Sequence, residues 1–372
     1  MVAVGLVLFV LSRYRSPQLA GAAVFLFTFP GLLLAPLAGA LLDRYGRARL
    51  VTVDYLAAGA MLALIAALSI GHALQPPILL LICGVASLTG PLGIGGARSL
   101  VPSLVPTHLW ERANALDSSS DVFSTIVGAP LAGVIVGLAG GEAALGVSAL
   151  LFAVAGVAMF TVRDGAFQPH GGPVLAEAWS GLLYVLRNRT LVGLAATFFA
   201  FSVGWGTLVL AVPVLILGPL HQGPAAVGYV WGLVGVAGLA SMLFVGRIRT
   251  DGRERQLMAG AILAMAAIMA VMPFAGSVVV VAVVLIGIAL VETPFDLAFL
   301  TLRQRRSDPT RFGRVFAISV SLNMIGGPVG AAIAGPLIAW NITVALWFAV
   351  AVTAVSAFFP LVMIPKRGGS GV

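Results

Sequence analysis

Residues 39–50 read GALLDRYGRARL and concentrate charge in a chain that otherwise carries very little of it. The chain is 60% hydrophobic and only 9% charged, and the preceding run from Ser16 to Leu42 holds no charged residue. Four charged residues then follow within one short stretch: Asp43, Arg44, Arg47 and Arg49. A long uncharged run that ends in a basic cluster is typical of a membrane span that leaves the bilayer on the cytoplasmic side.

The composition indicates that lipid surrounds most of the chain. Its mean hydropathy is +1.08, and a soluble chain of this length would need a polar shell that this sequence lacks. A span in lipid must satisfy its own backbone, which leaves helices or a closed barrel. The apolar runs are about 20 residues or longer and show no two-residue alternation. We therefore predict an all-α integral membrane protein.

Charged residues and Gly/Pro breaks predict eleven full spans after a short first segment, residues 1–11. These spans are 17–42, 51–71, 77–101, 113–138, 142–162, 190–217, 224–246, 256–273, 277–302, 313–338 and 341–364. The first segment is too short to cross a hydrocarbon core of about 30 Å at about 1.5 Å per residue. We therefore expect the chain to begin partway through its first helix.

The distribution of basic residues predicts the orientation. If the 39–50 loop is cytoplasmic and the loops alternate, every Lys and Arg except Arg13 and Arg15 lies on the cytoplasmic side. This bias follows the positive-inside rule, and one missed span would reverse every later loop and destroy it. The 39–50 loop and the C-terminus are therefore predicted to be cytoplasmic.

The span count divides the chain into two halves. Residues 1–162 form an N-terminal bundle of helices 1–6 with helix 1 incomplete, 163–189 a cytoplasmic linker with an amphipathic helix, and 190–372 a C-terminal bundle of helices 7–12. The halves contain a weak repeat, since VGAPLAGVIVG at 127–137 aligns with IGGPVGAAIAG at 325–335. Two similar six-helix halves around a site near the bilayer midplane are one plan of secondary transporters.

Carboxylates inside predicted spans are candidates for proton or cation binding, because charge at that depth is costly. Glu292 and Asp296 are four residues apart and share one helix face. Glu292 lies eleven residues from Arg303, about 16 Å along a helix axis, which places it near the middle of the membrane. The pair either carries a proton or faces a cationic substrate, or it is a structural pair with an arginine of another helix, such as Arg98.

Four further residues have both a functional and a structural interpretation. Asp121 and Asp117 lie near the start of a predicted helix, where a carboxylate also stabilises the positive end of the helix dipole. Asp54 either contributes to transport or pairs with nearby arginines. Trp205 either lines an aromatic-friendly cavity or packs in the helix bundle.

Small residues and prolines in the repeated segments predict joints that bend or gate. They are Gly128, Pro130, Gly133, Gly327, Pro328 and Gly330. Proline bends a helix, and glycine allows close approach of two helix backbones in a membrane.

Several classes of function are excluded. The net charge of +8 comes from short basic clusters between apolar runs, so it does not indicate a nucleic-acid-binding face. The four histidines are scattered, Cys83 is alone, and no catalytic, metal or cofactor pattern appears. The chain also lacks a Gly-x-x-x-x-Gly-Lys-Ser/Thr loop for ATP. We therefore predict neither an enzyme nor a cofactor.

The 39–50 stretch resembles a signature of the major facilitator superfamily, Gly-x-x-x-Asp-Arg-x-Gly-x-x-Arg, which that family carries between helices two and three. The matching residues are Gly39, Asp43, Arg44, Gly46 and Arg49. The segments GARSLVPSLVPTHLWERANAL at 96–116 and RFGRVFAISVSLNMIGGPVG at 311–330 are similar to a bacterial drug and siderophore exporter branch.

The resemblance implies two six-helix bundles related by a pseudo-two-fold axis and transport by alternating access. Gly39, Asp43, Arg44, Gly46, Arg47 and Arg49 would then form a gating latch that holds the outward-open state. The implied task is proton-coupled efflux of a small amphipathic compound by a monomer in the bacterial plasma membrane, with lipid, substrate and protons as its partners. The alternatives are a metabolite uptake transporter and a non-transporting, truncated membrane paralogue.

Overall fold

The computed structural model describes residues 1–372 except 163–182, 184–185, 246–252, 307–323 and 366–372. The described residues form helices and no strands, in agreement with the predicted all-α membrane fold. The chain divides into two compact units, Met1–Glu177 and Ala178–Val372, and this boundary falls inside the predicted linker. The amphipathic helix predicted for that linker lies outside the described residues.

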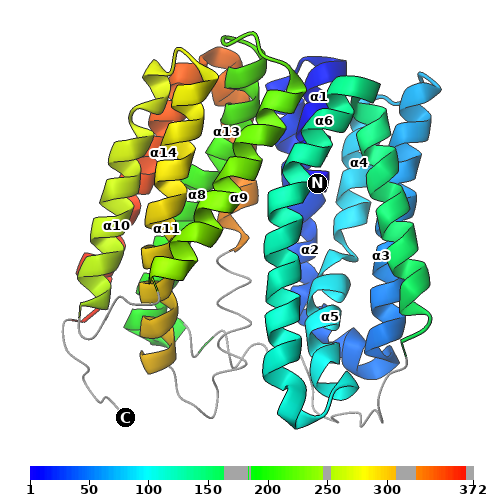
Figure 1. Ribbon diagram of the computed structural model, residues 1–372, viewed down its shortest axis with the longest axis horizontal. Coiled ribbons are helices and arrows are strands. Elements are labelled where there is room, and N and C mark those ends of the chain that lie inside the picture. The colour runs from blue at the N-terminus through cyan, green and yellow to red at the C-terminus, as the bar shows by residue number, and fades with distance from the viewer. Residues whose placement is uncertain (163–182, 184–185, 246–252, 307–323, 366–372) are drawn as a thin grey trace. The chain divides into compact units, whose positions relative to one another are not determined.

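The first unit is built from helices that each pack on several neighbours. They are α1 (Val2–Tyr14), α2 (Pro17–Tyr45), α3 (Arg47–Ile70), α4 (Pro76–Ser87), α5 (Gly90–Leu104), the 3-10 turn Thr107–Leu109 and α6 (Trp110–Met159). The long α6 contains a non-helical residue, Gly140 (φ 87°, ψ 169°), which separates its two predicted spans. α6 packs against both α1 and α3, and α1 lies beside α6 in Figure 1.

The second unit is organised around its first helix. Its elements are α8 (Arg189–Leu217), α9 (Pro224–Val245), α10 (Glu254–Met269), the 3-10 turn Met272–Phe274, α11 (Val278–Arg306), α13 (Gly326–Trp340), α14 (Ile342–Ser356) and α15 (Phe358–Met363). α8 packs against α13, α14 and α11. Of the residues in its most apolar 18-residue segment, 78% are buried. It therefore forms the core of this unit (Figure 1).

The helix boundaries confirm most of the predicted spans. Nine helical stretches of the described residues are long and apolar enough to cross a bilayer, and α1 and α13 are shorter apolar helices. The turns at 71–75, 218–223 and Asn341 lie at the predicted Gly, Pro and polar breaks. The first part of the predicted span 313–338 lies outside the described residues.

The predicted span over 77–101 corresponds to the apolar stretch Pro76–Ala97, but its helix is interrupted. The structure divides it into α4 and α5 around Leu88 and Thr89. Pro91 has no N–H for the carbonyl of Ser87 four residues earlier, which interrupts the helical ladder. The backbone bonds of Leu88 to Val85 and of Leu92 to Thr89 span three residues instead of four.

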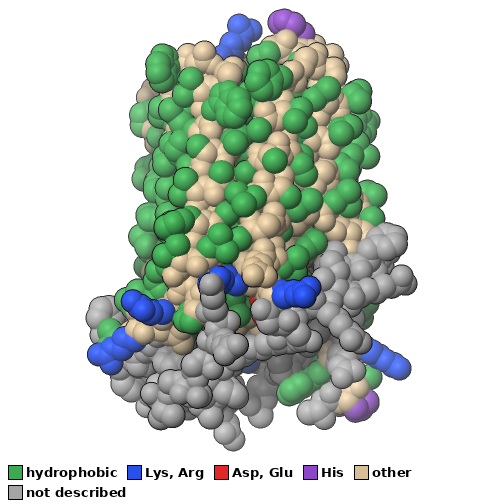
Figure 2. All heavy atoms as spheres, turned by 90° about the vertical axis from the view of Figure 1, so that its left-hand side faces the viewer, with side chains coloured by type: hydrophobic (Ala, Val, Ile, Leu, Met, Phe, Trp, Pro, Cys, Tyr) green, Lys and Arg blue, Asp and Glu red, His purple; other side chains and the backbone are tan. Residues whose placement is uncertain are grey.

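The surface of the described helices is the apolar surface that a bilayer requires. Large side chains such as Leu138 (84% exposed) and Phe274 (76% exposed) have no cover from the protein. Figure 2 shows hydrophobic side chains along one face, with most of the visible Lys and Arg side chains toward one end. An exposed apolar face bounded by basic residues fits a helix bundle in lipid.

Pro294 in α11 leaves a second carbonyl, that of Leu290, without its helical N–H donor. The hydroxyl of Ser241 in α9 donates a hydrogen bond to this oxygen at 2.9 Å. Because Ser241 is buried, water cannot donate a hydrogen bond to the Leu290 carbonyl in its place. This bond therefore satisfies α11 at its proline and joins α9 to α11.

We expect Ser241→Ala to destabilise the protein by about 1–2 kcal/mol, because the Leu290 carbonyl would be left without a donor. The measurement is thermal unfolding of the purified protein in detergent. Ser148→Ala is the matched control, since the buried Ser148 hydroxyl bonds only Ala144 of its own helix. Equal unfolding temperatures for the two variants would contradict the assignment.

Candidate functional site

The 39–50 motif forms the turn between α2 and α3. Gly46 joins the two helices with a positive φ of 93°, a backbone conformation that favours glycine. The Arg47 guanidinium reaches from this turn to α5, where Nη1 donates a hydrogen bond to the carbonyl of Ser99 at 2.7 Å. The motif therefore fastens the α2–α3 turn to α5.

The other motif residues have different surroundings. Arg44 and Arg49 are exposed, and the Arg44 guanidinium lies 5.5 Å from the ring centre of Tyr45. A Cβ at Gly39 would meet nothing within 4 Å. The side chain of Asp43 lies outside the described residues, so its role in a latch stays a prediction.

We expect Arg47→Ala to lower stability by about 1.5–3 kcal/mol, because the variant loses a charged hydrogen bond between elements. Arg49→Ala removes the same charge from an exposed position, and its effect should stay within about 0.5 kcal/mol. Thermal unfolding of both purified variants tests the difference. If Arg49→Ala were the more harmful change, the structural role of Arg47 would be refuted.

The second unit carries the acidic pair Glu292 and Asp296 on α11. Both residues are partly buried and lie inside the span Val278–Arg303. Neither carboxylate makes a hydrogen bond or an ion pair with a residue that the structure describes. The side chain of Arg98, their suggested partner, is outside the described residues. The arrangement can bind a proton or a cation.

Aromatic side chains follow the acids along α11 and pack against α8. Phe295, fully buried, lies between the two acids in sequence and packs against Phe198 and Phe201 of α8. One turn further along α11 is Phe299. The guanidinium of the buried Arg303 lies 4.8 Å from the centre of the Phe299 ring. A cation over an aromatic face is attracted by the ring electrons. The α8–α11 contact therefore consists of packed aromatic rings, with a buried arginine beside one of them.

Trp205 of α8 packs edge-to-face against Trp231 of α9, with ring centres 5.8 Å apart. The indole N–H of Trp231 is buried and has no acceptor among the described residues. Sequence analysis did not single out Trp231. An indole donor with no acceptor is available to a bound molecule.

The remaining acidic candidates lie in the first unit, away from the Glu292 pair in sequence. Asp54 is buried in α3 and lies against Gly93 of α5. Asp121 lies in α6, but its side chain is outside the described residues. Asp54 has no arginine partner among the described contacts.

The predicted joint residues of the second unit lie in the contact between α13 and α8. A Cβ at Gly330 would overlap the carbonyl oxygen of Val203, and a Cβ at Gly206 would overlap that of Gly327. The Thr207 hydroxyl donates to Val203 at 2.9 Å and to the carbonyl of Gly330 at 3.3 Å. Glycine here permits backbone-to-backbone packing, and the bending role stays a prediction.

The corresponding residues of the first unit lie in α6. Gly128 packs against the start of α1, where a Cβ would approach the Met1 nitrogen to 2.9 Å. Pro130 lies inside the helix and Gly133 is buried. These residues share a helix with Gly140, which provides the observed break in α6.

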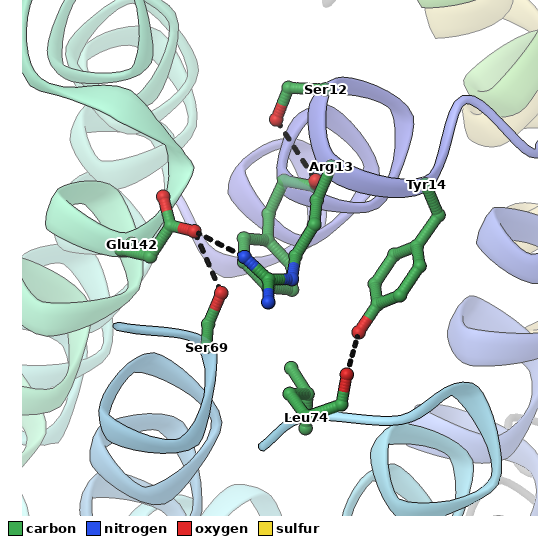
Figure 3. A network of polar contacts seen from close by, with 7 residues as sticks. Ser12, Arg13, Tyr14, Ser69, Leu74 and Glu142 are labelled. Atoms are coloured by element: carbon green, nitrogen blue, oxygen red, sulfur yellow. Dashed lines mark hydrogen bonds and ion pairs between the residues drawn. The ribbon is translucent and has the colours of Figure 1, made fainter. Parts of the chain in front are cut away.

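Sequence reasoning missed a polar network between the ends of α1 and α3 and the break in α6 at Gly140 (Figure 3). Glu142 accepts a hydrogen bond from Ser69 at 2.7 Å and lies 3.6 Å from Arg13 Nη1. Tyr14 donates to the carbonyl of Leu74 at 2.8 Å. Arg13 is one of the two basic residues outside the predicted cytoplasmic set, and Glu142, the first residue of a span predicted to begin on the same side, was the available signal.

Comparison with known proteins identifies a family. The model of the Major Facilitator Superfamily matches residues 1–295. The MFS-type transporter y4rN of Sinorhizobium fredii (strain NBRC 101917 / NGR234) is 38% identical over 97% of this chain and 89% of its own length. The multidrug efflux pump Tap of Mycobacterium tuberculosis (strain ATCC 25618 / H37Rv) is 25% identical over 88% of this chain and 80% of its own.

Solved structures with the same fold are much more distant in sequence. The nucleoside transporter NupG superposes with a TM-score of 0.75 at 11% identity, covering 97% of this chain and 95% of its own. The inward-open xylose transporter XylE from E. coli has a TM-score of 0.71 at 14% identity, with 99% and 94% covered. At these identities the likeness concerns the fold alone.

Proposed function

The chain belongs to the major facilitator superfamily, and from this premise we propose that it exports small amphipathic compounds in exchange for protons. Membership makes it a multi-pass secondary transporter of a small molecule and not an enzyme. The substrate, the direction and the coupling ion are the proposed part. The observation that carries the proposal is the Glu292 and Asp296 pair, two acids in one span without a described partner.

Acids at this depth favour a proton as the coupling ion. A carboxylate in the middle of a span is strongly disfavoured unless it binds a proton or a cation. Glu292 and Asp296 share a helix face, so ionising both at once brings like charges together. One proton shared between them removes that repulsion. A cationic substrate would neutralise the same pair and would thereby displace the proton.

Aromatic residues of α8 and α9 support an amphipathic, aromatic substrate. Phe198, Trp205 and Trp231 are only partly buried, and the indole N–H of Trp231 has no acceptor among the described residues. Aromatic rings bind apolar and cationic groups alike. Similarity to the multidrug efflux pump Tap over most of the chain supports export of such compounds.

The same proposal includes an orientation in the membrane, a monomeric state, and roles for the latch and joint residues. The 39–50 loop and the C-terminus face the cytoplasm of a bacterial cell, and the chain works as a monomer. The 39–50 latch holds one state of the alternating cycle, and the glycine and proline joints of α6 and α13 bend during it. Arg47 supports the latch, because it already connects two elements of the first unit.

Transport in cells tests the proposal. Cells expressing the protein should accumulate less of a fluorescent amphipathic cation than cells with an empty vector, and an uncoupler should abolish the difference. Equal accumulation across a panel of such dyes would refute drug export. Greater accumulation that depends on the proton gradient would instead indicate uptake.

A further inference from the structure

Asp54 is a carboxylic acid enclosed within the first unit. Its side chain is 5% exposed, and its Oδ1 atom has no hydrogen-bond partner in the described part of the chain. It lies seven residues after the start of α3, or about 10 Å along the helix axis, inside the span Arg47–Ile70. An ionised carboxylate with an unpaired oxygen is strongly disfavoured there. The enclosure therefore favours the protonated form.

The acid faces the break between α4 and α5. The Thr89 side chain hydrogen-bonds the Asp54 carboxylate. A Cβ at Gly93, in the first turn of α5, would overlap Asp54 Oδ2. Glycine at position 93 thus leaves the space that the carboxyl group occupies. The site is formed by a buried acid, a hydroxyl at the break and a glycine that accommodates the acid.

Thr89 connects the acid to the end of α4. Its Oγ1 lies 3.4 Å from the carbonyl oxygen of Ala86, a second possible acceptor for the same hydroxyl. A hydroxyl group has one proton to donate. When Asp54 is ionised, the Thr89 proton is drawn to the carboxylate. When Asp54 is protonated, its own O–H can donate to Thr89, and the Thr89 proton is free for Ala86.

The helix break is the element that such an exchange can affect. Pro91 removes the N–H that would bind the Ser87 carbonyl, and that oxygen lies instead against Gly31 of α2. Because one backbone hydrogen bond of the helix is missing, carbonyl groups at the C-terminal end of α4 also accept hydrogen bonds from side chains. The bond from Thr89 to Ala86 is one of these, and it is the one that Asp54 competes for.

The charged groups on the helices around the site are as follows. The elements packed against α3 are α6, α5, α4 and α2. α4 carries no charged residue. The charged residues of α6 are Glu111, Arg112, Asp117, Asp121 and Glu142. The other titratable or charged groups of α2, α3, α4 and α5 are Asp43, Arg44, Tyr45, Arg47, Arg49, Tyr55, Cys83 and Arg98. The side chains of Asp43 and Arg98 are outside the described residues, and Arg47 bonds Ser99.

We propose that Asp54 is a second proton-binding site of this transporter, and that its proton sets the hydrogen bonding at the α4–α5 break through Thr89. The proton comes from the aqueous phase and binds a carboxyl oxygen, with no other chemical change. The inference deepens the proposed proton coupling and places a proton in the first unit as well as at Glu292. It needs no assumption about the exported compound.

Infrared difference spectroscopy of the purified full chain in lipid nanodiscs tests the proposal without any transport. Changing the pH should reveal a C=O band of a buried protonated carboxyl group. Asp54→Asn should remove one such band, while Glu292→Gln should leave that band in place. Thr89→Val, which keeps the acid and removes the hydroxyl, should shift the same band, and Thr89→Ser should restore it.

The outcomes separate this inference from the proposed function. Retention of every titrating carboxyl band in Asp54→Asn would overturn the proton site, even if wild-type transport were driven by protons. An unshifted band in Thr89→Val would overturn the link to the helix break. If Asp54→Asn failed to fold, the Thr89→Val and Thr89→Ser spectra would still decide, because both variants retain the acid. Absence of drug export would leave the spectroscopic result unchanged.

Discussion

Glu292→Gln is expected to reduce substrate-driven proton movement to the level of liposomes without the protein. Glutamine keeps the size of the side chain and its ability to form hydrogen bonds, but it cannot bind and release a proton. Asp296 remains four residues away on the same face and then lacks the neighbour that shares its proton. The measurement is substrate-driven proton movement in proteoliposomes that contain the purified variant.

Glu142→Gln is the matched control for that experiment. Glu142 is also an acid within a predicted span, but it is bonded to Ser69 and lies near Arg13, just after the break in α6 at Gly140. Its side chain is 30% exposed and that of Arg13 23% exposed, so the change should cost at most about 1 kcal/mol of stability. Normal proton movement by Glu292→Gln, or its loss in Glu142→Gln alone, would remove Glu292 from the coupling mechanism.

Gly330→Ala is expected to have the largest effect on stability. The added Cβ would overlap the Val203 carbonyl oxygen and would lie 2.8 Å from the carbonyl carbon and 2.9 Å from the Cα atom. A backbone cannot move aside as a side chain does, so α8 and α13 would have to separate. Overpacking typically costs about 1–3 kcal/mol, and we expect the upper end of that range or more. Thermal unfolding in detergent and the yield of monodisperse protein measure the loss.

Gly327→Ala, three residues earlier on the same helix, provides a close control. A Cβ at Gly327 would meet nothing within 4 Å. Alanine also favours a helix over glycine by about 1 kcal/mol, so this variant should be as stable as the parent or slightly more stable. A loss at Gly327→Ala equal to that at Gly330→Ala would show that flexibility matters here and not packing. That result would favour the predicted bending role of this segment.

Much of the architecture follows from properties that lie along the chain. Hydropathy, the Gly/Pro breaks and the basic clusters predicted the membrane helices and their turns, because each span must satisfy its own backbone within lipid. The family signature was likewise visible as spacing from Gly39 to Arg49. Pro91 was equally visible, but a proline in a helix can kink it or end it, and the division into α4 and α5 was not predicted.

The neighbours of each helix were decided only by the tertiary structure. Hydropathy does not specify which apolar faces meet, since lipid and another helix are equally apolar partners. Folding alone brings Gly330 onto the backbone of Val203, Ser241 to the carbonyl that Pro294 leaves open, and Glu142 to Arg13. It also encloses Asp54, for which the sequence left a transport role and an arginine partner both open, beside Thr89 of the α4–α5 break and Gly93 of α5. Contacts between segments distant in sequence determine these surroundings, and hydropathy along the chain does not record them.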